Sequence, residues 1–148
     1  MTKKSVFIAL FSLFNVFISW AQTAHYNVVP LPKSIQYANA GDFILNSQTT
    51  IAYPKGNKAL HQNAILLAQY IQQSTGLQLK VVTKANDNSI TLRQNLTSNH
   101  TEAYQLKVTK MGVFIDGASD AGCFYGIQTL RKALPVGRVQ QVTLPSVE

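Results

Sequence analysis

The stretch that decides the fold is YQLKVTKMGVFIDGASDAGCFYGIQTLRKALP, residues 104–135. Its first six residues alternate apolar and polar side chains, a pattern typical of a half-buried strand. The turn residues Lys110–Gly112 lead into a second apolar strand, Val113–Ile115, which Asp116–Ser119 then interrupt. A helical pattern follows, so the stretch predicts two strands of a hairpin and then a helix.

The helix in this stretch shows one apolar stripe. Four apolar residues recur at spacings of four, three and four: Cys123, Ile127, Leu130 and Leu134. Ser119 or Asp120 is placed to cap its start, and Pro135 ends it. Gly122 and Gly126 each cost about 1 kcal/mol relative to alanine inside a helix. We therefore expect the backbone of this helix to pack closely against a neighbour.

An earlier helix has the same character. Its apolar residues share one face: Leu60, Ala64, Leu67, Ala68 and Ile71. Asn57 is placed to cap the start, and Gly76 suits the left-handed position after the end. The polar glutamines lie mostly off this stripe, so the helix is expected to lie on a sheet with one side exposed to water.

Short apolar runs separated by turn residues predict the remaining strands: Ser34–Tyr37, Phe43–Leu45, Thr50–Tyr53, Leu79–Thr83, Ser89–Leu92 and Gln140–Leu144. Lys84–Asn88 is a strong turn between two of them, and Gln22–Asn27 reads as a polar lead without a strand. Runs of strands between two helices favour an α+β fold. We expect a mostly antiparallel sheet of about seven strands with two helices packed on one face.

The first 21 residues resemble a secretory signal peptide in layout. Met1–Lys4 is a short cationic start, and an apolar run follows from Val6 to Ile18. Small residues at Ser19 and Ala21 fit the pattern that signal peptidase cleaves. A membrane anchor is the alternative, but a spanning helix needs about 20 apolar residues and this run is shorter. We expect cleavage near Ala21, export to the periplasm or the medium, and no stable membrane anchor.

Removal of residues 1–21 from the 148-residue chain leaves 127 residues, a normal size for one domain, 22–148. The formal net charge of +7 falls to +5 when Lys3 and Lys4 leave. The remaining basic residues are scattered rather than clustered, which argues against a nucleic-acid partner.

Few residues could carry chemistry. One cysteine and three histidines, spread along the chain, are too few and too scattered for a metal site, and no phosphate-binding loop is present. Cys123 lies in the apolar stripe and reads as a small buried residue. Glycosidase chemistry commonly needs two carboxylates, and Asp116 and Asp120 are the only close pair among six. Negative charge at a helix start explains both as capping residues. No catalytic, cofactor-binding or metal-binding residue is therefore assigned.

Five stretches carry a further signal when taken together: Glu102–Thr109, Gly112–Ile115, Ala121–Leu130, the opening Val29–Ser34 and the closing Val142–Pro145. They resemble the N-terminal, non-catalytic domain of bacterial β-N-acetylhexosaminidases of glycoside hydrolase family 20. The similarity covers nearly all of the predicted mature chain. Cys123 stands where the family more often has alanine, which keeps a small apolar residue at that position.

The resemblance implies a parent enzyme that releases terminal N-acetylhexosamine residues from glycans. In that family the substrate's acetamido oxygen attacks, helped by an Asp-Glu pair of a (β/α)8 barrel. That dipeptide is not in this sequence, so a barrel of roughly 250 residues is expected after Glu148. The chain alone is then expected to be inactive.

Two other functional classes remain open from the sequence. A free-standing sugar-binding module would stack sugar rings on exposed aromatics, for which Tyr26, Tyr37, Tyr53 and Tyr70 are candidates, although tyrosines at such positions are more often packed. An exported partner-binding domain would use an exposed apolar patch.

Overall fold

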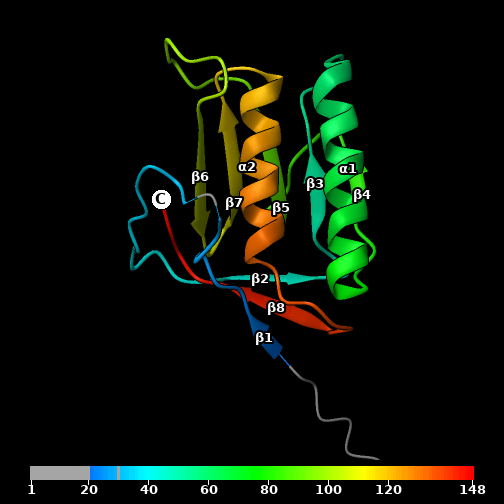
Figure 1. Cartoon of the computed structure of the whole chain (residues 1–148). Coiled ribbons are helices and arrows are strands. Elements are labelled where there is room, and N and C mark those ends of the chain that lie inside the picture. Colours follow the sequence, from blue (N-terminus) through cyan, green and yellow to red (C-terminus); the bar gives the residue numbers. More distant parts are fainter. Residues whose placement is uncertain (1–20, 30) are drawn as a thin grey trace, which may run out of the picture.

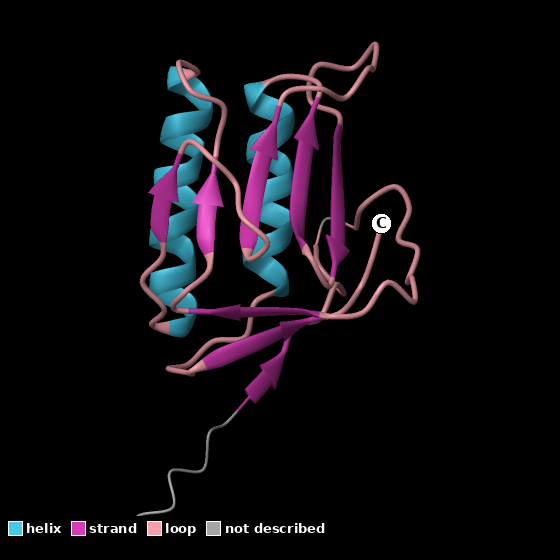
Figure 2. Ribbon diagram, turned by 180° about the vertical axis from the view of Figure 1, so that it is seen from behind, coloured by secondary structure: helices cyan, strands magenta, loops and turns pink. Residues whose placement is uncertain are grey.

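The computed structural model describes residues 21–29 and 31–148. A five-stranded sheet carries both helices on one face, and a three-stranded sheet lies across one end of this layer (Figures 1 and 2). The elements in chain order are β1 Ala21–Thr23, β2 Phe43–Asn46, β3 Thr50–Ala52, α1 Lys58–Thr75, β4 Lys80–Val82, β5 Ser89–Arg93, β6 Tyr104–Thr109, β7 Gly112–Gly117, α2 Asp120–Ala133 and β8 Gln141–Leu144. The predicted signal peptide, apart from Ala21, lies outside the described residues.

The α+β fold and the placement of both helices on one face are confirmed, but the mostly antiparallel sheet is wrong. In the large sheet, ordered β4-β3-β5-β7-β6, only the β6–β7 hairpin is antiparallel. The cause lies in the connections. Helix α1 carries the chain from the end of β3 back to the start of β4, and such a crossover makes the two strands parallel.

The predicted turn at Lys84–Asn88 exists, but it does not join paired strands. The Asn86 side-chain carbonyl accepts hydrogen bonds from the Asn88 N–H (3.1 Å) and the Ser89 hydroxyl (2.8 Å). Strands β4 and β5 nevertheless lie on opposite sides of β3, each parallel to it. In Figure 2 the connection passes the tip of β3 on the side that faces the viewer, away from the helices. Turn chemistry therefore predicted the bend but not its partners.

The small sheet differs from the expected strand pattern at two places. Strand β8 is its centre, antiparallel to β2 and parallel to β1. The expected polar lead, Gln22–Asn27, instead holds part of β1 and the buried Ala24 and Tyr26. Ser34–Tyr37 is not a strand, since only Tyr37 forms an isolated bridge. The described residues thus hold eight strands.

Both helices begin and end where their sequences predict. The Asn57 side chain accepts from the Leu60 N–H (2.9 Å), and Gly76 follows α1 with φ 78°. The Ser119 side chain caps α2 by accepting from the Gly122 N–H (3.2 Å). In the part of the chain described, no helix is long and apolar enough to cross a membrane.

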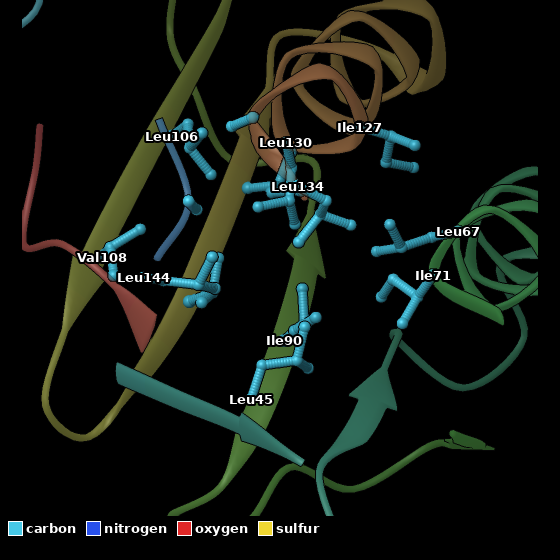
Figure 3. Close-up of a cluster of buried hydrophobic side chains, with 14 of the residues drawn as sticks. Leu45, Leu67, Ile71, Ile90, Leu106, Val108, Ile127, Leu130, Leu134 and Leu144 are labelled. Carbon is cyan, nitrogen blue, oxygen red and sulfur yellow. The ribbon is translucent and has the colours of Figure 1, made fainter. Parts of the chain in front are cut away.

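The core lies between the helices and the two sheets (Figure 3). The apolar stripes of both helices contribute to it, and β2 and β8 close one end with Leu45 and Leu144. The four residues of the predicted α2 stripe are all buried: Cys123, Ile127, Leu130 and Leu134. The packed α2 in turn forms one wall of a groove beside β6.

Candidate functional site

A groove of about 970 Å³ runs along β6, the edge strand of the large sheet. Its floor is β6 at Tyr104–Leu106, and one wall is the outer side of α2 from Tyr125 to Lys132. The opposite wall is the segment 31–36, and the chain end at Val147 and Glu148 closes it. We call this hollow the β6 groove.

Close packing of α2 against the hairpin forms the first wall. A Cβ atom on Gly122 would lie 2.2 Å from the carbonyl oxygen of Ala103, and one on Gly126 would lie 2.5 Å from Cγ2 of Ile115. Any larger residue would push the helix away. The Tyr104 and Thr129 hydroxyls are 2.6 Å apart, which ties β6 to α2. The close packing expected from these two glycines is confirmed.

Tyr26 anchors the segment that leads into the opposite wall. Its side chain is buried, and its hydroxyl donates to the carbonyl of Pro145 (3.2 Å). Burial, with smaller effects of Tyr37 and Asp42, raises the pKa of the Tyr26 hydroxyl far above its ordinary value. The phenol therefore stays neutral, and its role is to hold this segment in place. The Lys132 ammonium further donates to the backbone carbonyl of Val29.

The chain end lies between β6 and the segment 36–38. The Val108 N–H donates to the Val147 carbonyl (2.8 Å), and Gln36 and Glu148 exchange two backbone hydrogen bonds of 2.8 Å each. The Lys107 ammonium is 2.6 Å from the Glu148 carboxylate. This ion pair is exposed, so its main effect is to fix register rather than stability.

Asp116 and Asp120, the only close carboxylate pair in the sequence, do not form an acid–base site. Both Asp116 oxygens bind the Arg93 guanidinium at 2.6 Å, and this bond raises the pKa of Arg93. Asp116 is therefore an ion-pair partner, and its predicted capping role is wrong. Ser119 is the cap, and the exposed Asp120 lies in the first helical turn, where its charge favours the helix.

Cys123 and the histidines offer no catalytic cluster. Cys123 is buried, its thiol donates to the Arg93 carbonyl (2.9 Å), and burial raises its pKa to about 11. Among the described residues, no three histidine, cysteine or acidic side chains lie close enough to hold a metal ion. His61 stacks on Tyr53 with ring centroids 4.8 Å apart. Cys123 thus behaves as the small core residue that its sequence position predicts.

The four tyrosines considered for sugar stacking are mostly occupied. Tyr26 is buried, Tyr53 stacks on His61, and Arg131 lies 4.1 Å above the Tyr70 ring. Only Tyr37 is well exposed, at 67 %. The structure does not bring these rings together as a sugar-stacking platform.

The chemistry of the groove suits binding rather than bond cleavage. Its two carboxylates are Glu102 and Glu148, and the second is held by Lys107 and Gln105. The other lining residues are mostly apolar or amide side chains, together with two lysines, Lys33 and Lys132, and several hydroxyl side chains. The sequence did not indicate this groove, because its walls come from segments more than 60 residues apart and no local pattern marks their meeting.

Comparison with known proteins agrees with this architecture. The family model described as "Glycosyl hydrolase family 20, domain 2" matches residues 25–148. A β-hexosaminidase of Porphyromonas gingivalis is 32% identical over 124 residues, which cover 80% of this chain and 16% of that protein. The structure of the family 20 β-N-acetylhexosaminidase of Streptomyces coelicolor is 26% identical, with a TM-score of 0.68, over 81% of this chain and 25% of that one.

The N-acetyl-β-hexosaminidase of Streptomyces plicatus gives a similar match, with 25% identity and a TM-score of 0.67 over 81% of this chain and 25% of that one. The chain therefore spans a quarter or less of the length of these relatives. The family model, however, covers all of the described chain from His25 onward. The chain thus belongs to glycosyl hydrolase family 20, in which it corresponds to domain 2.

Proposed function

We propose that this chain is the N-terminal structural domain of a β-N-acetylhexosaminidase whose catalytic barrel follows Glu148 in the same polypeptide. One observation carries the proposal. The domain 2 model spans residues 25–148, while the relatives are four or more times as long as the region that they share with this chain. The substrate class of the whole enzyme would be glycans that end in N-acetylhexosamine.

The described residues support a structural role for this domain. Its one close pair of acidic residues is divided between an ion pair with Arg93 and the first turn of α2. Hydrolysis by the acetamido route needs an Asp-Glu pair at the sugar, and the sequence holds no such dipeptide. This domain would then stabilise and orient the barrel, and the barrel would carry out the hydrolysis.

The test is to read the codons that follow Glu148 in the gene. The proposal expects the reading frame to continue for at least the length of a barrel, roughly 250 residues, and to encode an Asp-Glu dipeptide. A stop codon directly after Glu148 would overturn it and would favour a free-standing binding module.

We also propose that the protein is exported after cleavage between Ala21 and Gln22. The cationic start, the short apolar run and the small residues at 19 and 21 support it. Cleavage there leaves Gln22 and Thr23 of β1 opposite Val142 and Thr143, so the new N-terminus stays within the small sheet. Intact-mass analysis of exported protein should give Gln22 as the first residue, whereas Met1 retained in purified membranes would contradict cleavage and favour a membrane anchor.

A further inference from the structure

The end of the chain runs antiparallel to β6, toward the β6 groove. Val147 lies opposite Val108 of β6 in antiparallel orientation, and the Lys107–Glu148 ion pair continues the same register. On its other side, Val147 bridges to Tyr37 and Glu148 pairs with Gln36. Residues 146–148 therefore form an extended chain end held between two neighbours, and Figure 1 shows this end running from β8 alongside β6.

Beyond Glu148, the edge of β6 offers unpaired backbone groups. The Val108 N–H points away from β7, because it donates to Val147. In an antiparallel pair this orientation repeats every second residue, so the N–H and C=O of Leu106 also point into the groove. Within residues 21–29 and 31–148, no hydrogen bond reaches the Leu106 backbone from that side.

The facing wall already pairs with the chain end through its backbone. Gln36 directs both its N–H and its C=O at Glu148. Ser34 lies two residues earlier, in a segment without strand structure, and lines the groove together with Leu106. An occupant that follows Glu148 would therefore pair with β6 on one side and lie beside this segment on the other.

We propose that the residues after Glu148 continue as an extended strand in the β6 groove, with position 149 opposite Leu106 and position 150 beside Ser34. This inference rests on the proposed function, since it needs a polypeptide that continues past Glu148. The added strand covers the edge of the large sheet, and exposed edges of this kind otherwise invite aggregation. It also fixes the direction in which the chain leaves this domain.

The register also specifies the side chains. Position 149 falls on the same face as Val147 and Leu106, which are 4% and 8% exposed, so an apolar residue is expected there. Position 150 falls on the face of Glu148, which is exposed, so a polar residue fits. A sugar fits this groove less well, because Tyr125 is the one exposed ring that lines it, and the neighbouring Phe124 ring lies edge-on to Tyr125 and outside the groove.

The experiment compares three proteins: the purified chain, the same chain lengthened at Glu148 by the probe tail Ile-Thr-Val-Thr, and a control with the tail Pro-Thr-Val-Thr. Proline at position 149 has no N–H for the Leu106 carbonyl, and its ring blocks the close approach of the strand. Hydrogen exchange of single backbone amides, followed by NMR, is the measurement.

The inference expects the Leu106 amide to exchange on the order of tenfold more slowly with the isoleucine tail, the effect of one ordinary hydrogen bond. The proline tail should leave it unchanged, and the Val108 amide should exchange alike in all three proteins. Equal Leu106 exchange in all three would overturn the inference.

Two further results would assign the groove to another occupant and so overturn the inference. One is protection of Leu106 in the chain without a tail that grows with protein concentration, which would indicate a second copy. The other is saturable binding of N-acetylglucosamine at Tyr125 that the isoleucine tail does not displace. The added tail tests whether the groove accepts a strand, whatever the gene encodes after Glu148. A stop codon after Glu148 would therefore refute the proposed function, but it would not change the outcome of the exchange experiment.

Discussion

Two glycines of α2 set the distance between that helix and the large sheet. Their cost in a helix indicated close packing from the sequence alone, but the atoms they contact lie on β7 and just before β6, which no helical pattern specifies. The sequence thus predicted that another part of the chain packs closely against the helix backbone. Only the structure showed that this part is Ile115 and Ala103.

Gly126→Ala should destabilise the domain. The new Cβ would lie 2.5 Å from Cγ2 of Ile115 and 3.2 Å from Cδ2 of Tyr104, so overpacking should cost about 1–3 kcal/mol in the free energy of unfolding. Chemical denaturation measures this cost. Ile115→Ala removes the clashing Cγ2, so the double variant should be more stable than the sum of the two single effects. A Gly126→Ala protein that is more stable than the parent, as helix propensity alone predicts, would contradict the close contact.

Cys123 should resist thiol reagents until the protein unfolds. Burial raises its pKa from 9.0 to about 11, so little thiolate forms at pH 8, and the side chain is fully buried. A chromogenic disulfide reagent should label no thiol in the native chain and one after denaturation, because the sequence holds a single cysteine. Rapid labelling of the native protein would refute the core assignment.

The same pKa shift gives a pH dependence of stability. Below pH 9 the thiol is protonated in both states and its contribution is constant. Between pH 9 and about 11 the unfolded chain loses this proton before the folded chain does, so stability should fall as pH rises. The slope due to this group is at most roughly 1.4 kcal/mol per pH unit. Cys123→Ala should lose that slope while keeping the contributions of the lysines and tyrosines.

At the scale of elements, local signals placed both helices and most strands, and long-range pairing limited the rest. Caps and apolar stripes depend on residues within a few positions, so Asn57, Gly76 and Ser119 could be assigned correctly. Strand direction depends on connections: α1 makes β3 and β4 parallel, and a six-residue crossing carries the chain from β4 past β3 to β5. Strand β1 was missed because its pairing with β8 joins segments about 120 residues apart.

Leu130→Ala tests α2 as a central element of the core. Leu130 is fully buried between the sheet and the helices, so its truncation should cost about 2–5 kcal/mol. Leu31 is 72% exposed, and the same truncation there should change stability by less than about 0.5 kcal/mol. Urea denaturation of both variants is the comparison. Similar losses in the two would show that α2 does not carry the core as described.

The whole molecule shows a folded domain whose groove suits binding and whose acidic pair is not arranged for catalysis. The resemblance of scattered sequence stretches was sufficient to identify the family. Three of the stretches form most of the β6–β7 hairpin and α2, and the other two lie in segment 29–34 and in β8 with the proline after it. The groove could not be predicted in the same way, since it exists only when segments 31–36, 104–106 and 147–148 come together. Sequence similarity therefore identified the domain, and the fold revealed the β6 groove, in which we propose that the chain continues.

Our central proposal is that this chain is a structural domain of a hexosaminidase and does not itself hydrolyse glycans. Hydrolysis of a chromogenic N-acetylglucosaminide tests it most directly. The purified 148-residue chain should release chromophore at the rate of a buffer blank. The longer product of the uninterrupted reading frame, assayed at the same concentration, should turn the substrate over. Robust turnover by the short chain that survives re-purification would contradict this proposal.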